Sequence, residues 1–525
     1  MDFYLPYDKA DAILQGMTLE QKVGQMVVAS VEVTHLDDKT RRFLKDNMVG
    51  NIILFGKNCV DRAQIAQLDA QLQEEIAANT GVQALISIDQ EGGPVTRIRN
   101  GATVFPCAMA IGSTGDAENA FLTGCIMGNE MRELGIYFDL APVLDINFDN
   151  NDPIVGRRSY GETPEETALF GAAMARGLRA AGIIDCGKHF PGHGHSRKDT
   201  HFDFDVQDAT REQIMRENIV PFRRAMGDGM RAIMTSHICY PALDPECVPN
   251  TMSKRVLRDF VRDELGFEGL VISDGMQMLA IADHYGAPEG CVRAAEAGCD
   301  LLIVGNGGDN ADPDGLDVQT PCIRAMVEAA KRGELSMERV NESARRILAF
   351  KLALGDMRPT AQAATRDWRA HEAFAKALAS MSVTVHRDTL HMLPLKAGAL
   401  FLSGKSKARL GVEEGDRLVD GFASLAARLL NGTAIEFDGV PDLDAMKRAV
   451  IDAPAVVVGV TSKRECETLV PMMKEILSVN ERLCVVCLDA PHVLSLVPFV
   501  PCAVSSYDQT ATAIRAVCQA LDSKG

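Results

Sequence analysis

The strongest constraint on the fold is an alternation that fills the first two thirds of the sequence. Between about residues 18 and 355, short apolar runs are separated by helical patterns; the runs lie at 26–29, 52–55, 84–88, 138–144, 183–186, 232–235, 270–272 and 301–304. Short runs that are apolar throughout are typical of parallel strands buried on both faces. Eight strand–helix units predict a TIM-like (β/α)8 barrel, and the pattern alone leaves a doubly wound sheet as the alternative.

The residues that follow these runs favour the barrel. Polar side chains come just after several of the runs, among them Asp89, Asp145, Lys188, His189 and Asp274. In a (β/α)8 barrel the carboxyl ends of all strands meet on one face, where active sites lie. We therefore expect these side chains to gather at one end of the barrel.

The chain of 525 residues is longer than one barrel requires, since such a barrel takes about 250 residues or more. An amphipathic helix at 337–354 ends at Gly355, and residues 356–366 are typical of a linker. New strand-like runs follow at 383–385, 400–402, 455–460, 483–488 and 503–505. We predict a catalytic barrel over 1–355, a linker over 356–366 and a smaller α/β domain over 367–525.

Composition excludes several classes of partner. A net charge of −18 argues against a general nucleic-acid or membrane-surface binder, because both partners are anionic. No run of about 18 uncharged apolar residues is present, and the N-terminus lacks the features of a signal peptide. We therefore expect a cytoplasmic protein that does not bind membranes.

The cysteines point to the same compartment. The 14 cysteines have no framework spacing, which predicts free thiols in a reducing compartment. Cys484 and Cys487 form a CxxC pair inside the apolar run LCVVCL. That run predicts a buried strand rather than a redox site.

The densest group of polar residues is KHFPGHGHSRKDTH, from Lys188 to His201. Its proline and glycines predict a loop. One interpretation is a solvated loop. Another is a metal site in which histidines and Asp199 supply ligands, although no His-x3-His helix and no second segment rich in carboxylates supports it. The third is acid/base catalysis, because histidine titrates near neutrality and Asp199 can orient and stabilise a charged His201. We favour the third and expect neither a metal nor a cofactor.

Asp274 and Asp89 each follow a predicted buried strand, so either carboxylate can project into the barrel mouth. The plainer interpretations are a helix N-cap for Asp274 and a turn residue for Asp89. Arg158 and Lys188 are basic residues in predicted loops, where most such residues are only solvated.

Taken together, these segments resemble glycoside hydrolase family 3, in its β-N-acetylglucosaminidase (β-hexosaminidase) branch. The matches cover roughly 18–355 and run in order: IDQEGGPV (88–95), APVLD (141–145), RSYG (158–161), KHFPGHG (188–194), DTH (199–201), MTSH (234–237) and SD (273–274). KHFPGHG followed by Asp-[Ser/Thr]-His is highly specific to this branch, whereas β-glucosidase branches keep only the Lys-His pair.

The resemblance implies a TIM-like barrel followed by an α/β sandwich domain, and a retaining glycosidase. It implies that Asp274 is the nucleophile and that His201, partnered by Asp199, is the acid/base. It further implies that sugar hydroxyls are held by Asp89, Arg158, Lys188 and His189. The chain departs from the family pattern at His195, where Asp or Asn is common, and at Gly275, where many members have a second Asp.

The expected substrate is a terminal β-linked N-acetylglucosamine on a muropeptide or a chitooligosaccharide, as in cell-wall recycling. A neutral imidazole does not repel an anionic acceptor, so inorganic phosphate can compete with water and make the enzyme a phosphorylase. Three further hypotheses are a family 3 β-glucosidase or β-xylosidase, a metal-dependent hydrolase, and a carbohydrate-binding protein without activity. The presence of Asp274, Asp199 and His201 together argues against the last. The sequence makes no prediction of oligomeric state.

Overall fold

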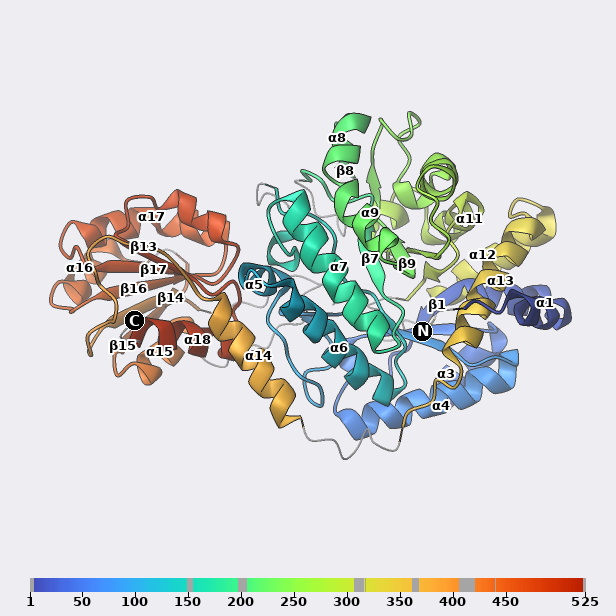
Figure 1. Cartoon of the computed structure of the whole chain (residues 1–525), viewed down its shortest axis with the longest axis horizontal. Helices are drawn as coiled ribbons and strands as arrows, with labels where there is room; N and C mark the ends of the chain where they lie inside the picture. Colours follow the sequence, from blue (N-terminus) through green and yellow to red (C-terminus); the bar gives the residue numbers. More distant parts are fainter. Residues whose placement is uncertain are drawn as a thin grey trace.

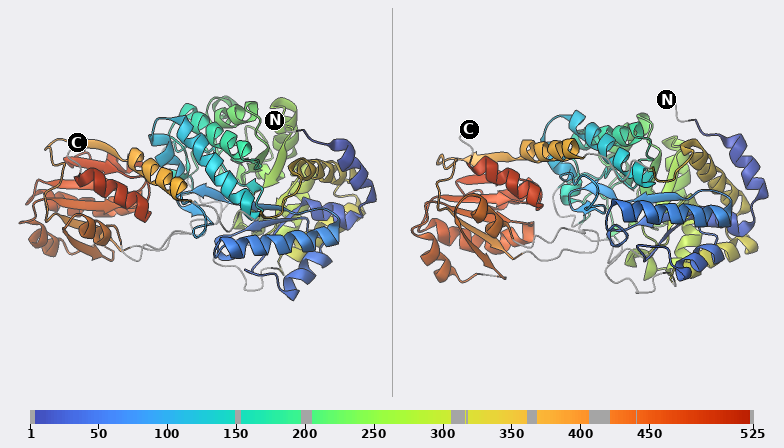
Figure 2. Two further views of the ribbon diagram at one scale, coloured as in Figure 1. Left: turned by 60° about the horizontal axis from the view of Figure 1, so that its bottom comes forward. Right: turned by 90° about the horizontal axis from the view of Figure 1, so that it is seen from below.

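The computed structural model describes residues 4–148, 154–196, 205–305, 316, 318–360, 368–405, 421–439 and 441–522. Within these ranges the chain forms two bodies that stand side by side (Figure 1). The same separation is visible from two further directions (Figure 2). The first body is a barrel, and the second is a smaller layered α/β domain.

The barrel strands are all parallel and form a closed ring. Their bounds are β1 (Val27–Ser30), β2 (Asn51–Leu54), β3 (Leu85–Ile88), β6 (Phe138–Asp139), β7 (Cys186–Phe190), β9 (Ala232–Thr235), β11 (Leu270–Ser273) and β12 (Leu302–Ile303). One sheet has the order β12-β1-β2-β3-β6 and another the order β11-β9-β7. Parallel bridges Phe138–Ile184 and Ile272–Leu301 join the two sheets at both edges. The predicted TIM-like (β/α)8 barrel is therefore confirmed, and the doubly wound alternative is wrong for this part of the chain.

Helices connect the strands and cover the barrel. They are α1 (Tyr7–Gly16), α2 (Leu19–Met26), α3 (Asp38–Asp46), α4 (Arg62–Thr80), α5 (Ala108–Ser113), α6 (Ala117–Leu134), α7 (Pro164–Ala180), α8 (Arg211–Arg216), α9 (Ile219–Gly227), the π-helix η4 (Arg255–Glu264), α10 (Leu279–Ala282), α11 (Ala287–Ala297), α12 (Gln319–Arg332) and α13 (Met337–Leu354). Capping residues define both ends of α4: the side chain of Asp61 accepts a hydrogen bond from the Gln64 N–H at its start, and Gly81 ends the helix with a φ of 78°.

Two barrel strands differ from their predicted bounds. The run 138–144 is regular strand only over Phe138–Asp139, and beyond it Val143 makes a single bridge to Lys188. Pro142 lies in this stretch and has no N–H to donate to a ladder. The strand expected at 183–186 begins at Cys186, because the N–H of Ile183 still bonds to the Leu178 carbonyl at the end of α7.

The second body contains a six-stranded sheet. Its strands are β13 (Thr384–Asp388), β14 (Leu400–Gly404), β15 (Thr433–Phe437), β16 (Val456–Val460), β17 (Leu483–Cys487) and β18 (Cys502–Ser505), in the order β13-β18-β17-β16-β14-β15. Only β13 runs antiparallel. The helices are α14 (Arg369–Ser382), α15 (Phe422–Leu429), α16 (Leu443–Val450), α17 (Lys463–Leu477) and α18 (Ala511–Asp522).

Separate apolar clusters lie on the two faces of this sheet, one against α16 and α17 and the other against α15 and α18. The predicted α/β sandwich is thus confirmed, and Cys484 and Cys487 lie in the buried strand β17 as expected. Residues 361–366 of the predicted linker lie outside the described residues, so the division at 355 and 367 stays a prediction.

The carboxyl ends of β17 and β18 face the barrel. Cys107 and Met109 of the barrel pack against Ala490 and Tyr507, and α14 contacts both α5 and α18. Arg157 Nη1 donates to the carbonyl of Leu488 at 3.2 Å. The two bodies are therefore joined close to Arg158, one of the predicted site residues.

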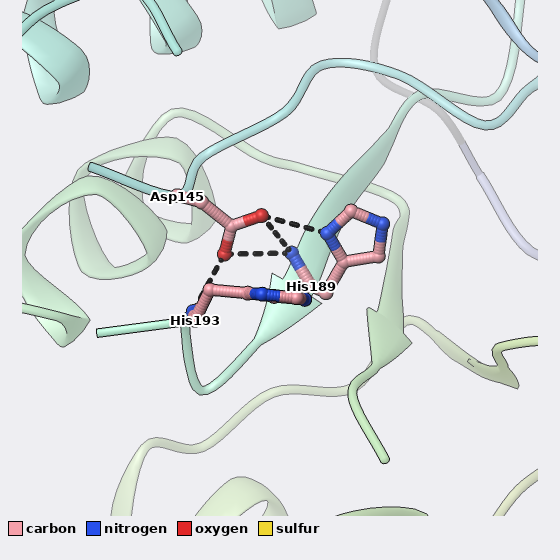
Figure 3. A group of neighbouring side chains, drawn as sticks. All are labelled: Asp145, His189 and His193. Atoms are coloured by element: carbon pink, nitrogen blue, oxygen red, sulfur yellow. Dashed lines mark hydrogen bonds and ion pairs between the residues drawn. The ribbon is translucent and has the colours of Figure 1, made fainter. Parts of the chain in front are cut away.

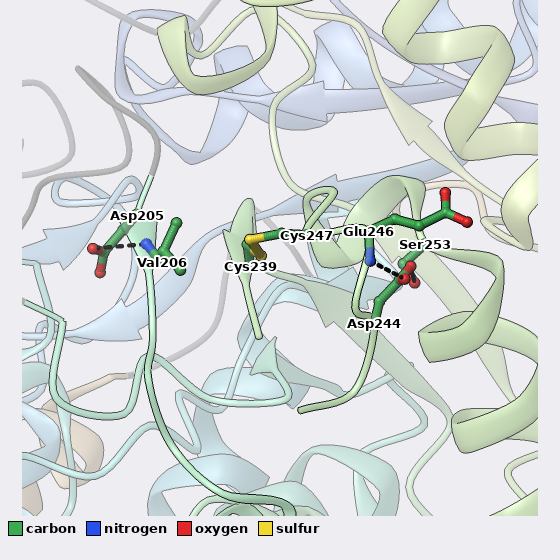
Figure 4. Close-up of a disulfide and its surroundings, with 7 residues drawn as sticks. All are labelled: Asp205, Val206, Cys239, Asp244, Glu246, Cys247 and Ser253. Atoms are coloured by element: carbon green, nitrogen blue, oxygen red, sulfur yellow. Dashed lines mark hydrogen bonds between the residues drawn. A yellow bond between two sulfur atoms is a disulfide. The ribbon is translucent and has the colours of Figure 1, made fainter. Parts of the chain in front are cut away.

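The expectation that all cysteines are free is wrong at two positions. Cys239 and Cys247 form a disulfide with a Cα–Cα distance of 5.4 Å (Figure 4). They lie only eight residues apart, and the turn after β10 (Ile238–Cys239) brings them together. The other twelve cysteines are free. No helix in the described ranges has the length and apolar character that a membrane crossing requires.

Candidate active site

Lys188 lies at the centre of the polar residues at the strand ends. It is in β7 and almost fully buried, and its Nζ lies 2.6 Å from Asp89 Oδ1 and 2.6 Å from Glu91 Oε1. Burial acts to lower the pKa of Lys188, but the two carboxylates outweigh it and raise the pKa above its usual range. Lys188 therefore carries a fixed positive charge that joins two acidic groups.

Arg158 belongs to the same cluster through Glu91. It ends the short 3-10 helix η2 (Gly156–Arg158), and its Nε and Nη2 donate to the two Glu91 oxygens at 2.8 and 2.7 Å. Burial would raise the pKa of Glu91, but Arg158 and Lys188 hold it far below its usual range. We call Asp89, Glu91, Arg158 and Lys188 the upper cluster.

Glu91 was not among the predicted site residues. The only signal for it was its place in the IDQEGG segment, two residues after Asp89. Asp89 itself is the most exposed member of the upper cluster, with 14% of its side chain accessible against 2–5% for the other three. Its second oxygen lies 3.5 Å from Arg97 Nη2. Asp89 is therefore the carboxylate of this cluster that a ligand can reach.

Asp139 at the end of β6 was also missed. It is fully buried, its Oδ1 accepts from the Gln90 N–H at 3.0 Å, and its Oδ2 has no hydrogen-bond partner among the described residues. Burial raises the pKa of Asp139 well above its usual range. Asp139 is thus a buried carboxyl group, disfavoured in its ionised form by burial, within range of the charges of Lys188, Asp89 and Glu91.

Asp145 organises the start of the loop after β7 (Figure 3). Its Oδ2 lies 2.6 Å from His189 Nδ1, and its oxygens also accept from the backbone N–H groups of His189 and His193. Burial opposes ionisation, but His189 and these donors bring the pKa of Asp145 to about 2. Burial lowers the pKa of His189, so we assign it a neutral ring that donates Nδ1–H to the carboxylate.

Asp145, His189 and His193 are also the described group whose spacing suits a metal ion, with ligand atoms within 4.8 Å of one another. Both oxygens of Asp145 already accept hydrogen bonds from His189 or His193, and a metal would have to displace the bond to His189 Nδ1. The arrangement fits a hydrogen-bonded anchor for the loop better than a metal centre.

Asp274 follows β11, as predicted. The N–H of Gly275 donates to Asp274 Oδ1 at 2.7 Å, while the Gly275 carbonyl lies 3.0 Å from His237 Nε2. The other ring nitrogen of His237 lies 2.9 Å from Thr251 Oγ1. The charge of Asp274 acts on His189 and, together with that of Asp145, opposes the effect of burial on the pKa of His189.

Gly275 and His195, the two positions that depart from the family pattern, have different surroundings. A Cβ placed on Gly275 would meet Met278 Cγ at 3.6 Å, which is ordinary contact, so the fold leaves room for a side chain there. His195 is half-exposed and stacks on Phe148 with ring centroids 4.5 Å apart. His195 therefore has a packing partner of its own.

Asp199 and His201 lie outside the described residues. The residues on either side of their segment are held together: Ser196 Oγ donates to Asp205 Oδ2 at 2.5 Å, and Gln207 Nε2 donates to the same oxygen at 2.7 Å. Of the seven predicted site residues, the structure brings Asp89, Arg158 and Lys188 into one cluster, holds His189 against Asp145 and places Asp274 after β11. The roles of all seven stay predictions.

Comparisons with known proteins agree with this geometry. The model of the glycosyl hydrolase family 3 N-terminal domain matches residues 18–350. A β-hexosaminidase of Thiobacillus denitrificans is 37% identical over 303 residues, which is 56% of this chain and 82% of that protein. A β-hexosaminidase of Neisseria meningitidis serogroup C is 30% identical over 362 residues, 68% of this chain and 94% of that protein.

Among solved structures, a family 3 β-N-acetylglucosaminidase from Paenibacillus sp. str. FPU-7 superposes with a TM-score of 0.87 at 32% identity. The match covers 96% of this chain and 97% of that chain, so it includes both bodies. The family match takes in every strand of the barrel and the loops that carry the upper cluster and Asp274. The chain belongs to glycoside hydrolase family 3 and is a glycoside hydrolase.

Proposed function

We propose that this enzyme is a retaining exo-β-N-acetylglucosaminidase that removes terminal β-linked N-acetylglucosamine. The observation that supports it most is the upper cluster, a set of buried charges that presents Asp89 at the strand ends where Asp274 also lies. The similar β-hexosaminidases and the similar β-N-acetylglucosaminidase structure favour this sugar over glucose.

In the proposed mechanism Asp274 attacks the anomeric carbon. The bond from the Gly275 N–H to Oδ1 fixes the orientation of the carboxylate, and His237 Nε2 contacts the carbonyl of the same glycine, in the next peptide along the chain. A covalent α-glycosyl enzyme forms and is then hydrolysed, so the β configuration returns.

His201 serves as the acid/base in place of the second carboxylate of most retaining glycosidases. As an imidazolium it protonates the leaving oxygen, and as a neutral ring it then accepts a proton from water. Asp199 stabilises the charged form and keeps the pKa of His201 high enough for the acid step.

The sugar hydroxyls are held by Asp89, Lys188, His189 and Arg158. Asp89 accepts from hydroxyls, whereas Arg158 uses two of its nitrogens on Glu91 and so also acts by fixing the cluster. His189, held through Nδ1 by Asp145, directs its other ring nitrogen away from that carboxylate (Figure 3).

The proposed substrate is a muropeptide or chitooligosaccharide in cell-wall recycling, and the proposed location is the cytoplasm. The Cys239–Cys247 disulfide is the observation that weighs against a reducing compartment. A phosphorylase that uses the same residues is the second candidate, favoured by the neutral base that the mechanism requires.

Rates on nitrophenyl N-acetylglucosaminide and nitrophenyl glucoside, with and without phosphate, test the proposal. We expect the first substrate to be preferred, the β-anomer of the sugar to appear first by NMR, and no sugar 1-phosphate. Sugar 1-phosphate as the main product would establish the phosphorylase, and an α-anomer formed first would exclude a covalent intermediate.

Asp274→Ala tests the nucleophile. This variant should be inactive but should yield the α-glycosyl azide when azide is added, and formation of the β-glycosyl azide would remove Asp274 from its role.

A further inference from the structure

The second body has a feature that the proposed hydrolysis does not use. Along the sheet, β14 has β15 on one side and β16 on the other, so the chain reverses its direction of progress between β14 and β16. The helix after β14, α15, covers one face, and α17 after β16 covers the opposite face. In open α/β sheets, ligands bind in the crevice at the carboxyl ends of the strands where this reversal occurs.

A cavity of about 540 Å3 lies at this point. It is lined by residues that end β14, β15 and β16 and by the starts of α15 and α17. This volume lies within the range of about 300–1,000 Å3 that is usual for small-molecule sites.

Two glycines of the cavity wall bring the backbone close to carboxylates, of which Glu465 itself lines the cavity. A Cβ on Gly404 would lie 2.5 Å from Glu465 Oε1, and one on Gly421 would lie 2.5 Å from Glu436 Oε1. Glu465 Oε2 accepts from the N–H and the hydroxyl of Thr461, at 2.6 and 2.5 Å. Oε1 of Glu465 accepts no hydrogen bond from the described residues, so it is available to a ligand hydroxyl.

Two cations also line the cavity. Lys405 directly follows β14 and Arg464 lies in the first turn of α17, and both are exposed. Neither makes an ion pair with a described residue. The start of α17, which carries a partial positive charge, adds to them. Asp438 lies beyond β15, on the side of β14 away from α17. The cations and the helix end thus favour a phosphate on the α17 side, while Glu465 accepts from hydroxyls and the half-buried Phe437 ring offers an apolar surface.

We propose that this cavity binds a phosphate monoester of a hydroxyl-bearing ring compound, that is, a sugar phosphate or a nucleoside monophosphate. Lys405, Arg464 and the start of α17 hold the phosphate, and Glu465 accepts from a ring hydroxyl. The wall residue Leu488 accepts the hydrogen bond from Arg157, so the site lies directly behind the boundary with the barrel.

Calorimetric titration of the full-length protein with N-acetylglucosamine 6-phosphate, AMP and inorganic phosphate tests the proposal and identifies the source of the ring. We expect one of the two esters to bind with one-to-one stoichiometry and more tightly than inorganic phosphate. Arg464→Met should weaken that binding about tenfold, since it removes a charged hydrogen-bond donor. Gly404→Val should block it, because the added side chain collides with Glu465.

Arg448→Met, which changes an exposed arginine on α16 outside the cavity, is the matched control and should leave affinity unchanged. Failure of both esters to bind, binding no tighter than that of inorganic phosphate, or binding that Arg464→Met leaves unchanged would each overturn the proposal. Arg464 lies outside the barrel, so the loss of affinity in Arg464→Met separates binding in this cavity from binding of the sugar at the barrel site, and it does not depend on hydrolysis.

Discussion

Two networks of buried charges lie at opposite ends of the barrel and differ in design. The upper cluster, at the carboxyl ends of the strands, shares Lys188 between two carboxylates. The lower cluster lies at the amino end of β12, where Asp300 accepts from Arg339 at 2.7 Å, Arg346 at 2.6 Å and Arg262 at 2.9 Å. Its cations come from the helices α13 and η4, whereas those of the upper cluster come from strand β7 and the short 3-10 helix η2.

Accessibility distinguishes the two networks more clearly than charge does. The carboxylate of Asp300 has no exposed surface, and three arginines and the Val271 N–H occupy it. Asp89 in the upper cluster keeps 14% of its side chain accessible. A closed network of this kind fixes helices to the barrel, whereas a network with one reachable member is suited to bind substrate. Burial of charge alone therefore does not mark a functional site.

The largest effect is expected from breaking the lower cluster. Asp300→Asn leaves three arginines without their shared carboxylate, and the loss of one partner from a buried ionic network costs about 3–5 kcal/mol. We expect the free energy of unfolding, measured by urea denaturation, to fall by that amount while kcat/KM of the folded enzyme stays unchanged. Asp11→Asn, which breaks the half-exposed pair with Arg345, is the control and should lower the free energy of unfolding far less than Asp300→Asn does. A large loss of kcat/KM in Asp300→Asn would contradict the division between the two ends.

Lys188→Met tests the upper cluster, where we expect a loss of activity with little loss of stability. A charged hydrogen bond to substrate contributes about 1.5–3 kcal/mol, so we expect kcat/KM on the nitrophenyl substrate to fall by about 100-fold. The midpoint of urea unfolding should change less than in Asp300→Asn, because Arg158 and Arg97 still face the two carboxylates. Lys57→Met, which removes a partly exposed lysine, should leave kcat/KM as it is. A stability loss without a rate loss would make the upper cluster structural too.

Acid should weaken both ends of the barrel. Carboxylates whose folded pKa is lowered stabilise the fold above their unfolded pKa, and this contribution is lost as pH falls toward the folded value. With a pKa of about 2, the buried Asp145 should contribute about 2 kcal/mol that disappears between about pH 4 and pH 2. Asp300, whose three arginines lower its pKa against the effect of burial, should lose its contribution in the same direction.

Urea unfolding at pH 5, 4, 3 and 2 measures this decline. The decline should be shallower in Asp300→Asn, in which the lower cluster no longer titrates. Identical slopes in the wild type and this variant would show that Asp300 is not among the groups responsible.

The smallest effect is expected beside Asp274, the proposed nucleophile. Gly275→Ala adds a methyl group with only ordinary contacts, so kcat/KM should change by less than about twofold and stability by less than about 0.5 kcal/mol. Gly93→Ala is the contrasting variant, because φ is 57° there and the new Cβ would lie 2.4 Å from Cys107 Cβ. If Gly275→Ala lowered kcat/KM and stability as much as Gly93→Ala, the site would be limited by steric contacts at Gly275 rather than by its charges.

The barrel was predictable because its strands are continuous apolar runs between helices. The runs at 232–235 and 270–272 correspond closely to β9 and β11. The edge strand β15 was missed because its sequence, TAIEF, is partly exposed and has no continuous apolar run. Short or interrupted strands depend on contacts with distant neighbours, which a local pattern does not contain.

For the site, the sequence indicated which segments carry chemistry but not how their side chains pair. Glu91 and Asp139 were missed because their importance depends on Lys188 and Gln90 reaching them from other segments. The disulfide between Cys239 and Cys247 was missed for the same reason, since cysteine spacing does not report the turn that joins them.

The hydrogen bond from Arg157 to Leu488 gives the second domain a share in shaping the candidate active site. Arg157 and Arg158 are consecutive in one short turn of 3-10 helix, so the peptide that aims one guanidinium at Glu91 also aims the other across the boundary. A barrel expressed without residues 367–525 would keep all seven proposed site residues but would lose the hydrogen bond to Leu488 that supports the turn carrying Arg158.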